Sequence, residues 1–410
     1  MIRSFYINNF KSLVDFRLPP SPHALGPFTC LVGLNGAGKS TVLQAFDFLG
    51  HLVNGRVADW LKQREWDKAD LTSRFLKRQQ LINFELSLDV DGLGRIEWQG
   101  AFNVPLLRCT AESVRVNQSD VLRIDEQRLV VAGPAGEKQF DYALSGLQYQ
   151  GSTLSLLKPE ILHEGLHALK ELAGNLRSLD MLSPHSMRRR AKDADDIGYG
   201  GERLSAYLHA LPKAAKDEIA ATLRDFYPQV QDWTTTALRA GWKDLRVTEV
   251  YRDANQRPLD TRARQINDGM LRVLAVLSQI AMSESAHFSL PTGAVRTSLR
   301  QKSCVLFDEI ENGINPELMQ KLVALMLKAS RQIIVTTHSP LILNYLPDDV
   351  AREAVLLLFR NSQGHTKVVR LFDLPTTSHK LTLLGPGEVF VDTNLVDLPF
   401  EAALVGAGGA

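Results

Sequence analysis

Short apolar segments separated by turns open the chain, and they predict strands. The segment at 28–32 runs directly into a glycine-rich stretch, which is followed by a predicted helix over 39–53. Residues 81–90 alternate strictly between apolar and polar side chains, the period-2 pattern of a half-buried antiparallel strand. We therefore expect the region 1–153 to be rich in β-structure. Its predicted strands lie at 2–7, 13–18, 28–32, 81–90, 121–124 and 128–131.

The hydrophobic pattern changes near residue 154 to a helical spacing. Apolar residues from Leu162 to Ala173 recur at i, i+4, i+7 and i+11, which places them on one stripe of a helix. Two further helices are predicted at 202–210 and 214–226. We predict a mainly helical insertion over 154–265, which is too short and too poor in heptads for a long coiled-coil arm.

Strand-like and helix-like segments alternate in the C-terminal part. A helix is predicted from Asp268 to about residue 282, and a flexible tail over 401–410, where small residues dominate. The alternation between them predicts parallel strands with crossover helices, hence an α/β fold class. The alternating segments are 305–307, 316–327, 333–336, 341–345 and 355–359.

The composition is that of an ordinary folded protein. The chain has 410 residues, of which 44% are hydrophobic and 23% charged, so it can bury a large core without disulfides or metal. Its three cysteines form no CxxC pair, which fits a reducing compartment. We find no apolar run of signal-peptide or membrane-spanning length, and expect a soluble, cytoplasmic protein without a membrane partner. A formal net charge of +1 implies no strong attraction to nucleic acid.

A glycine-rich loop carries the strongest chemical signal. GLNGAGKS, residues 33–40, fits GxxxxGK[ST], follows a predicted strand and precedes a helix, which favours a phosphate-binding loop over an incidental turn. Its backbone N–H groups would meet phosphates, Lys39 would neutralise the β- and γ-phosphates, and Ser40 would coordinate Mg²⁺. The candidate nucleotide-binding residues are Gly33, Asn35, Gly36, Gly38, Lys39, Ser40 and Thr41.

Two later strand ends carry further candidate residues. SCVLFDEIENG, from Ser303 to Gly313, is an apolar segment that ends in two carboxylates. Asp308 is a candidate Mg²⁺ ligand and Glu309 a candidate to polarise the attacking water; the alternative is a strand capped by solvated acids. VTTHSP follows, with His338 placed to contact a γ-phosphate or the water unless it is merely structural.

Two other segments allow more than one interpretation. QINDGMLRVLAVL opens a helix with Asn267 and Asp268 as cap residues, while Gly269 would let a phosphate approach the backbone. By itself this segment is an ordinary capped helix. MRRRAK, at 187–192, is either a nucleic-acid contact or a loop that pairs with Asp193, Asp195 and Asp196.

The order of GLNGAGKS, INDGMLR, FDEIENGINP and TTHSP resembles the ABC ATPases of the SMC, RecF and OLD branch, often labelled AAA-type ATPases in bacteria. The opening INNFKSL is also similar, so the resemblance covers nearly the whole chain. It implies a P-loop NTPase head with an antiparallel β subdomain and a helical lobe, which hydrolyses ATP with Mg²⁺ and dimerises head to head. The implied halves of the head are 1–153 and 266–400.

The resemblance also assigns roles that the residues alone do not. Asn267 to Gly269 would contact the γ-phosphate held by a partner subunit, and 311–315 would be the D-loop along the dimer seam. Gln63, Gln79 and Gln80 are alternative metal-contacting glutamines.

The chain departs from the family pattern in two places. The signature usually opens with serine, where this chain has Asn267, and we expect a weakened contact across the dimer. The family commonly reads EPE and then histidine before proline, where this chain has Glu309-Ile310-Glu311 and Asn315-Pro316. These changes affect the expected turnover more than ATP binding.

Three functions compete at this level. The first is an ATPase that forms a homodimer or higher homo-oligomer and serves as sensor and scaffold for a separate effector, a nuclease or toxin, in antiphage defence. The alternative is a DNA-repair or chromosome-maintenance ATPase that acts directly on DNA. A transporter subunit is the third, disfavoured by a signature unlike LSGGQ. Only about 70 residues follow His338, so we expect no fused nuclease domain.

Overall fold

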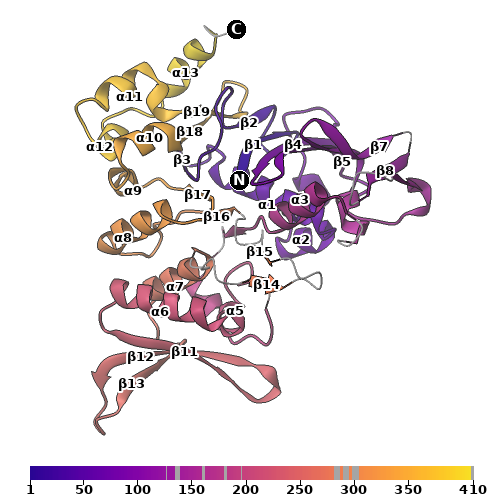
Figure 1. The fold of residues 1–410 in the computed structure, drawn as a ribbon. Helices are drawn as coiled ribbons and strands as arrows, with labels where there is room; N and C mark the ends of the chain where they lie inside the picture. Colours follow the sequence, from indigo (N-terminus) through magenta and orange to yellow (C-terminus); the bar gives the residue numbers. More distant parts are fainter. Residues whose placement is uncertain are drawn as a thin grey trace. The chain divides into compact units, whose positions relative to one another are not determined.

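The computed structural model of the chain describes residues 1–125, 127–133, 139–158, 162–179, 182–194, 196–280, 287–289, 295–297 and 304–407. The chain forms two compact units, each assembled from segments far apart in the sequence (Figure 1). The first unit contains Met1–Ser178, Lys302–Leu306 and Gln332–Ala410, and the second contains Leu179–Gln301 and Phe307–Arg331. The division therefore falls at 178/179, whereas the sequence places the start of the insertion at 154.

An antiparallel sheet forms the first layer of unit one. Its strands are β1 (Ile2–Asn8), β2 (Phe16–Leu18), β4 (Leu81–Val90), β5 (Gly94–Asn103), β6 (Arg108–Val116), β7 (Ser119–Asp125), β8 (Arg128–Ala132) and β9 (Gln139–Ala143). Their order is β2-β1-β4-β5-β6-β7-β8-β9. Strand β4 buries every second side chain, as its alternation predicts. The predicted antiparallel β region is confirmed.

One predicted strand of this region is shorter than expected. The sequence predicts a strand over 13–18, but β2 begins only at Phe16. Asn9, Lys11 and Asp15 all have left-handed φ angles, of 66°, 49° and 46°. Left-handed residues interrupt extended backbone, so the chain turns here before it can pair.

A mixed sheet forms the other layer and contains the segment before the glycine-rich loop. Its strands are β3 (Phe28–Val32), β10 (Ser178–Leu179), β16 (Val305–Phe307), β17 (Ile333–Thr336), β18 (Val355–Arg360) and β19 (Thr366–Arg370). Their order is β10-β16-β17-β3-β18-β19. β3 pairs in parallel with β17 and β18 and is buried throughout, because strands covered on both faces read as continuous apolar runs. This confirms the predicted parallel arrangement, and β19 adds an antiparallel edge that the sequence did not predict.

The helices of unit one pack around these sheets. They are α1 (Lys39–Val53), α2 (Val57–Gln63), α3 (Glu164–Gly174), α9 (Pro340–Asn344), α10 (Asp348–Ala354), α11 (Pro375–Lys380), α12 (Pro386–Val391) and α13 (Leu398–Ala407). α1 has the predicted bounds and is buried almost all round. Its Phe46 ring packs against Phe5, and its Phe48 ring meets Phe102 edge-on. The predicted flexible tail over 401–410 is wrong for 401–407, which continue α13; 408–410 lie outside the described residues.

The second unit combines helices with a small antiparallel sheet. Its helices are α4 (Pro184–Met187), α5 (Leu204–Ala210), α6 (Lys213–Phe226), α7 (Asp268–Ile280) and α8 (Pro316–Leu327), and its strands are β11 (Val230–Ala237), β12 (Lys243–Arg252) and β13 (Pro258–Arg262), with a short hairpin of β14 (His287–Ser289) and β15 (Val295–Thr297). The sequence predicts a mainly helical insertion over 154–265 and does not predict the sheet of order β11-β12-β13. Trp233 of β11 and Val247 of β12 are buried. The predicted end of α7 near residue 282 lies outside the described residues.

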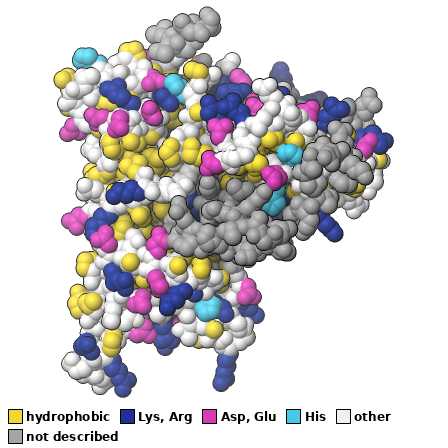
Figure 2. Space-filling model, viewed as in Figure 1, with side chains coloured by type: hydrophobic (Ala, Val, Ile, Leu, Met, Phe, Trp, Pro, Cys, Tyr) yellow, Lys and Arg dark blue, Asp and Glu magenta, His cyan; other side chains and the backbone are white. Residues whose placement is uncertain are grey.

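Charges of both signs are mixed on one face of the molecule. On the face shown in Figure 2, lysine and arginine side chains lie among aspartate and glutamate side chains. In the part of the chain that the structure describes, no helix is both long and apolar enough to cross a membrane.

Candidate functional site

The glycine-rich loop lies where its strand-to-helix position predicts. It leaves the end of β3 at Val32 and enters α1 at Lys39. The Lys39 side chain is buried, and its Nζ donates to the carbonyl oxygens of Gly33 at 2.9 Å and Leu34 at 3.4 Å. The ammonium group is therefore held over the loop itself, as a phosphate-neutralising lysine must be.

Two glycines of the loop are required by its packing as well as by its shape. Gly33 has a φ of 146°, and a Cβ there would lie 2.3 Å from the carbonyl oxygen of Leu358. Gly38 has a φ of 107°, and a Cβ there would lie 2.4 Å from Oγ1 of Thr366. A side chain at either position would meet both a left-handed backbone and a hard contact.

The N-terminus of α1 fits an anionic ligand. Its N-cap residue is Gly38, no side chain makes a cap hydrogen bond, and the first turn contains no acidic residue. The positive end of the helix dipole is therefore not neutralised by a nearby carboxylate. Ser40 and Thr41 stand in this first turn and are half-buried, so the structure places their hydroxyls on the helix end that a triphosphate would meet.

His338 follows the strand next to β3. Thr336 of β17 is in register with Leu31 of β3, and the Thr337 N–H donates to the Leu31 carbonyl oxygen at 3.1 Å. Because the two strands are parallel, the loop and His338 leave the sheet at the same edge. His338 is exposed.

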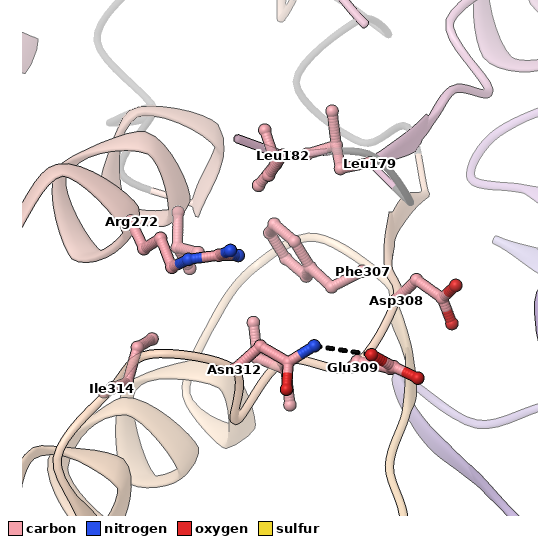
Figure 3. A pocket seen from close by; sticks show the side chains of 10 residues that line it. Leu179, Leu182, Arg272, Phe307, Asp308, Glu309, Asn312 and Ile314 are labelled. Atoms are coloured by element: carbon pink, nitrogen blue, oxygen red, sulfur yellow. Dashed lines mark hydrogen bonds between the residues drawn. The ribbon is translucent and has the colours of Figure 1, made fainter. Parts of the chain in front are cut away.

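The acidic pair belongs to the second unit, where Glu309 opens a tight turn after β16. Its φ is 45°, a left-handed value that is costly for a residue with a side chain. Asn312 closes this turn twice: its backbone N–H donates to the Glu309 carbonyl oxygen at 2.9 Å, and its Nδ2 donates to Glu309 Oε2 at 2.5 Å. Figure 3 shows this bond, with Asp308 directed away from it. The carboxylate of Glu309 is thus held in one orientation.

A small cavity of about 80 Å³ adjoins this turn. Phe307, Glu309 and Asn312 line it, and the Arg272 guanidinium points into it from α7 (Figure 3). Arg272 is half-buried; burial lowers its pKa from the ordinary value, against the opposing effect of the Asp268 and Glu309 carboxylates. The guanidinium of Arg272, on the helix α7 that begins at Asp268, therefore faces the acidic turn.

The segment 267–269 forms the N-terminus of α7, as predicted. Asn267 Oδ1 accepts from the Met270 N–H at 2.7 Å, an N-cap bond, while Asn267 and Asp268 remain exposed. Arg188 braces both sides of this cap, because its Nη2 donates to the Ile266 carbonyl oxygen at 2.8 Å and to Asp268 Oδ1 at 2.5 Å.

Gly269 has a packing reason that the sequence did not predict. A Cβ at this position would lie 2.8 Å from the carbonyl oxygen of Gly313, at the end of the acidic turn. The second unit thus brings the segment 267–269 against 309–313. Approach of a phosphate to Gly269, the predicted reason, stays a prediction.

The basic cluster MRRRAK is paired in a way that local sequence does not predict. Arg188 pairs with Asp268, and Arg190 with the buried Asp244 at 2.7 Å. Asp196 pairs instead with Arg203, and Asp195 lies outside the described residues. The expected self-paired loop is therefore corrected for Arg188 and Arg190, which pair with distant segments.

The sequence does not predict the contacts of four side chains in the site. Arg188 contacts Asp268, Asn312 contacts Glu309, Arg360 contacts the Gly36 carbonyl oxygen and Thr366 contacts the Ala37 carbonyl oxygen. The choice among the three candidate metal-contacting glutamines stays open. Gln63 ends α2, Gln79 and Gln80 precede β4, and all three are exposed.

Among the residues that the structure describes, no group of three or more His, Cys, Asp or Glu side chains could hold a metal ion by itself.

Comparison with known proteins gives the class. The fold and the loop define a P-loop ATPase of the α/β class. The structure of an SMC head bound to the C-winged helix domain of ScpA has the same fold, with a TM-score of 0.53. The two chains are 13% identical, and the match covers 90% of this chain and 97% of that one. The SMC head domain from Thermotoga maritima matches with a TM-score of 0.45 and 12% identity, over 90% of this chain and 98% of that one.

Sequence comparison gives the family. A model described as "AAA domain, putative AbiEii toxin, Type IV TA system" matches residues 132–344, more than half of the chain, and one described as "AAA ATPase domain" matches residues 1–89. This protein belongs to the first of these AAA-domain families and carries an AAA-type ATPase domain. The OLD nuclease of Thermus scotoductus is 32% identical over 140 residues, 33% of this chain but only 23% of the nuclease.

Proposed function

We propose that this ATPase closes as a homodimer around ATP and serves as sensor and scaffold for a separate effector protein in antiphage defence. The observation that carries the nucleotide part is the buried Lys39 over a loop whose Gly33 and Gly38 admit no side chain. The effector part draws on the family description, which names a toxin, and on the partial match to a nuclease.

The triphosphate would bind to the loop from Gly33 to Thr41. Ser40 and Asp308 would hold Mg²⁺, which when bound neutralises phosphate oxygens. Glu309 would accept the proton of the attacking water, and His338 would contact the γ-phosphate. Both carboxylates are half-buried, which suits groups that must reach a ligand.

A groove of about 470 Å³ beside Thr41 is suited to the nucleoside end of ATP. Trp66 and Phe75 line it with aromatic surface, and Arg74 and Asp70 supply polar groups. A base stacks on aromatic rings, while a ribose needs polar partners. The groove and the loop share Thr41, so one ligand could occupy both.

The dimer is proposed from the exposure of the signature segment. Asn267 and Asp268 lie exposed at the N-terminus of α7, a helix of 13 residues. In the resembling ATPases this segment meets the nucleotide of the partner subunit. Asn267 already caps its own helix through Oδ1, which leaves its amide NH₂ as the donor toward a phosphate.

Direct action on DNA is the weaker alternative. Two arginines of MRRRAK are engaged with Asp268 and Asp244, so they are compensated and would have to exchange partners to bind phosphate. The net charge of +1 supplies little further attraction.

Glu309→Gln tests the proposed chemistry. We expect this variant to bind ATP, to hydrolyse it at least about 100-fold more slowly and to accumulate as an ATP-dependent dimer, because the general base is lost while the shape of the side chain changes little. The assays are phosphate release and light scattering after gel filtration, with Glu317→Gln, an exposed acid on α8, as the matched control. Unchanged turnover removes Glu309 from this role, and a monomer in saturating ATP removes the dimer.

The effector hypothesis needs a separate measurement. Duplex and single-stranded DNA are added to the ATPase assay, and the product of the adjacent reading frame is co-expressed. An ATP-dependent complex without DNA stimulation supports the scaffold. Strong stimulation by DNA, with no complex, supports the alternative.

A further inference from the structure

The hairpin of β18 and β19 forms a wall against the outer side of the phosphate loop. Arg360 and Thr366 are directly opposite each other in the register of this hairpin. Arg360 Nε donates to the Gly36 carbonyl oxygen at 2.8 Å, and Thr366 Oγ1 donates to the Ala37 carbonyl oxygen at 2.9 Å. One cross-strand pair therefore holds two consecutive carbonyl groups of the loop.

Holding a carbonyl fixes the next N–H, because C=O and N–H point in opposite directions across a planar trans peptide. The Ala37 N–H, opposite the Gly36 carbonyl, donates to the Leu34 carbonyl oxygen at 3.1 Å and closes the turn of the loop. The Gly38 N–H, opposite the Ala37 carbonyl, points away from Thr366. That is the side on which N–H groups of such a loop meet phosphate oxygens.

The direction of the hydrogen bonds around Thr366 is determined by chemistry. A carbonyl oxygen only accepts, so the Thr366 hydroxyl must donate to Ala37. The bond of 2.9 Å between Ser12 Oγ and Thr366 Oγ1 then requires Ser12 to be its donor. Ser12, Ala37 and Thr366 are all buried, so water cannot readily replace a missing partner.

We propose that Thr366, with Arg360 beside it, is a positioning residue that presets the Gly38 N–H of the phosphate loop for the nucleotide. This inference rests on the proposed ATP site and adds to it the part of the chain that shapes the loop. The buried Thr366 acts through the Ala37 carbonyl, whereas Arg360 holds the Gly36 carbonyl and also lines the groove beside Thr41.

Thr366→Val is the first test, since it removes both hydroxyl bonds with little change in volume. We expect the Kd for a fluorescent ATP analogue, and the KM for ATP, to rise about tenfold, because a buried carbonyl loses its donor and the peptide can rotate. The kcat at saturating ATP should change far less. Thr366→Ser, which keeps the hydroxyl, should restore the affinity.

Thr377→Val is the matched control, because Thr377 is likewise buried and donates through its hydroxyl to the carbonyl oxygens of Leu371 and of Leu374, the residue that caps α11. It should lower thermal stability without changing the Kd. Equal Kd values for wild type and Thr366→Val overturn the inference, and so does a rise that Thr366→Ser fails to reverse.

Arg360→Gln decides the question if Thr366→Val does not fold. We expect a rise in Kd of about threefold, since a neutral amide reaches the Gly36 carbonyl less well than a guanidinium; an unchanged Kd overturns the proposal. Lys39→Ala separates this inference from the proposed function. If Lys39→Ala still binds ATP, the proposed ATP site is refuted. If Lys39→Ala loses ATP binding while Thr366→Val binds ATP as the wild type does, only the positioning role is refuted.

Discussion

Asn312 offers a sharp test of how Glu309 is oriented. The perturbation is Asn312→Ala, which removes the amide that donates to Glu309 Oε2 at 2.5 Å and leaves the backbone bond of 2.9 Å between Asn312 and Glu309 in place. Glu309 also carries a left-handed φ of 45°. Without the amide, the Glu309 carboxylate loses a hydrogen bond that holds its present rotamer.

The magnitude follows from the nature of this bond. A hydrogen bond to a charged group contributes about 1.5–3 kcal/mol, and the lower figure applies here because both side chains are only half-buried. If this orientation is needed in the transition state, about 1.4 kcal/mol corresponds to roughly a tenfold fall in kcat. The KM for ATP should stay within about twofold, because Asn312 does not orient the loop that binds the phosphates.

The assay is steady-state phosphate release by Asn312→Ala, Asn312→Ser and the double variant with Glu309→Gln. Asn312→Ser keeps a donor and should recover part of the rate. In the Glu309→Gln background, Asn312→Ala should have no further effect, since the two changes then act on one group. A full-rate Asn312→Ala enzyme, or an equal loss in both backgrounds, would refute the reasoning.

Two further predictions concern stability. Arg188→Met should lower the free energy of unfolding by about 1 kcal/mol, because it removes two hydrogen bonds at the start of α7, one of them to the largely exposed Asp268. Urea unfolding of a double-mutant cycle with Asp268→Asn measures the coupling energy between the two side chains. A coupling energy of zero contradicts the prediction. His51 is buried beside Asp47, Arg64 and Arg177, and burial lowers its pKa from 6.5. The unfolded state therefore binds the proton more readily than the folded state, so stability should fall as the pH drops below about 6.5. His51→Asn should flatten this part of the plot of Tm against pH. If the slope is the same in the variant, other groups cause the pH dependence.

The elements that the sequence predicts best are those with a local cause. β3, α1, β4, α8 and β17 have the predicted bounds. Each shows a strong pattern, such as the strict alternation of 81–90 or the proline that opens α8 after the Asn315 cap. The β11–β13 sheet was missed because its solvent-facing strands carry many charged and threonine residues, so the alternation is weak.

The residues of the candidate site likewise differ in whether a local sequence pattern marks them. The local motifs name Lys39 and Glu309 because each needs only its neighbours in the sequence, whereas the role of Asn267 follows from the family resemblance. Arg360 acts on Gly36, 324 positions away, and Thr366 acts on Ala37 across 329 positions. No local pattern marks such residues, since their role exists only after β18 has paired with β3.

The glycines show why a motif describes less than the structure requires. A phosphate-binding loop needs Gly33 and Gly38 for close approach of a ligand, and that reason is visible in the sequence. In the folded chain, however, a Cβ at Gly33 meets the backbone of β18 before it could meet any ligand, and one at Gly38 meets Thr366. Gly269 likewise faces the Gly313 carbonyl oxygen. These glycines are therefore fixed by the protein's own packing, so alanine at any of them should distort the site even with no nucleotide bound.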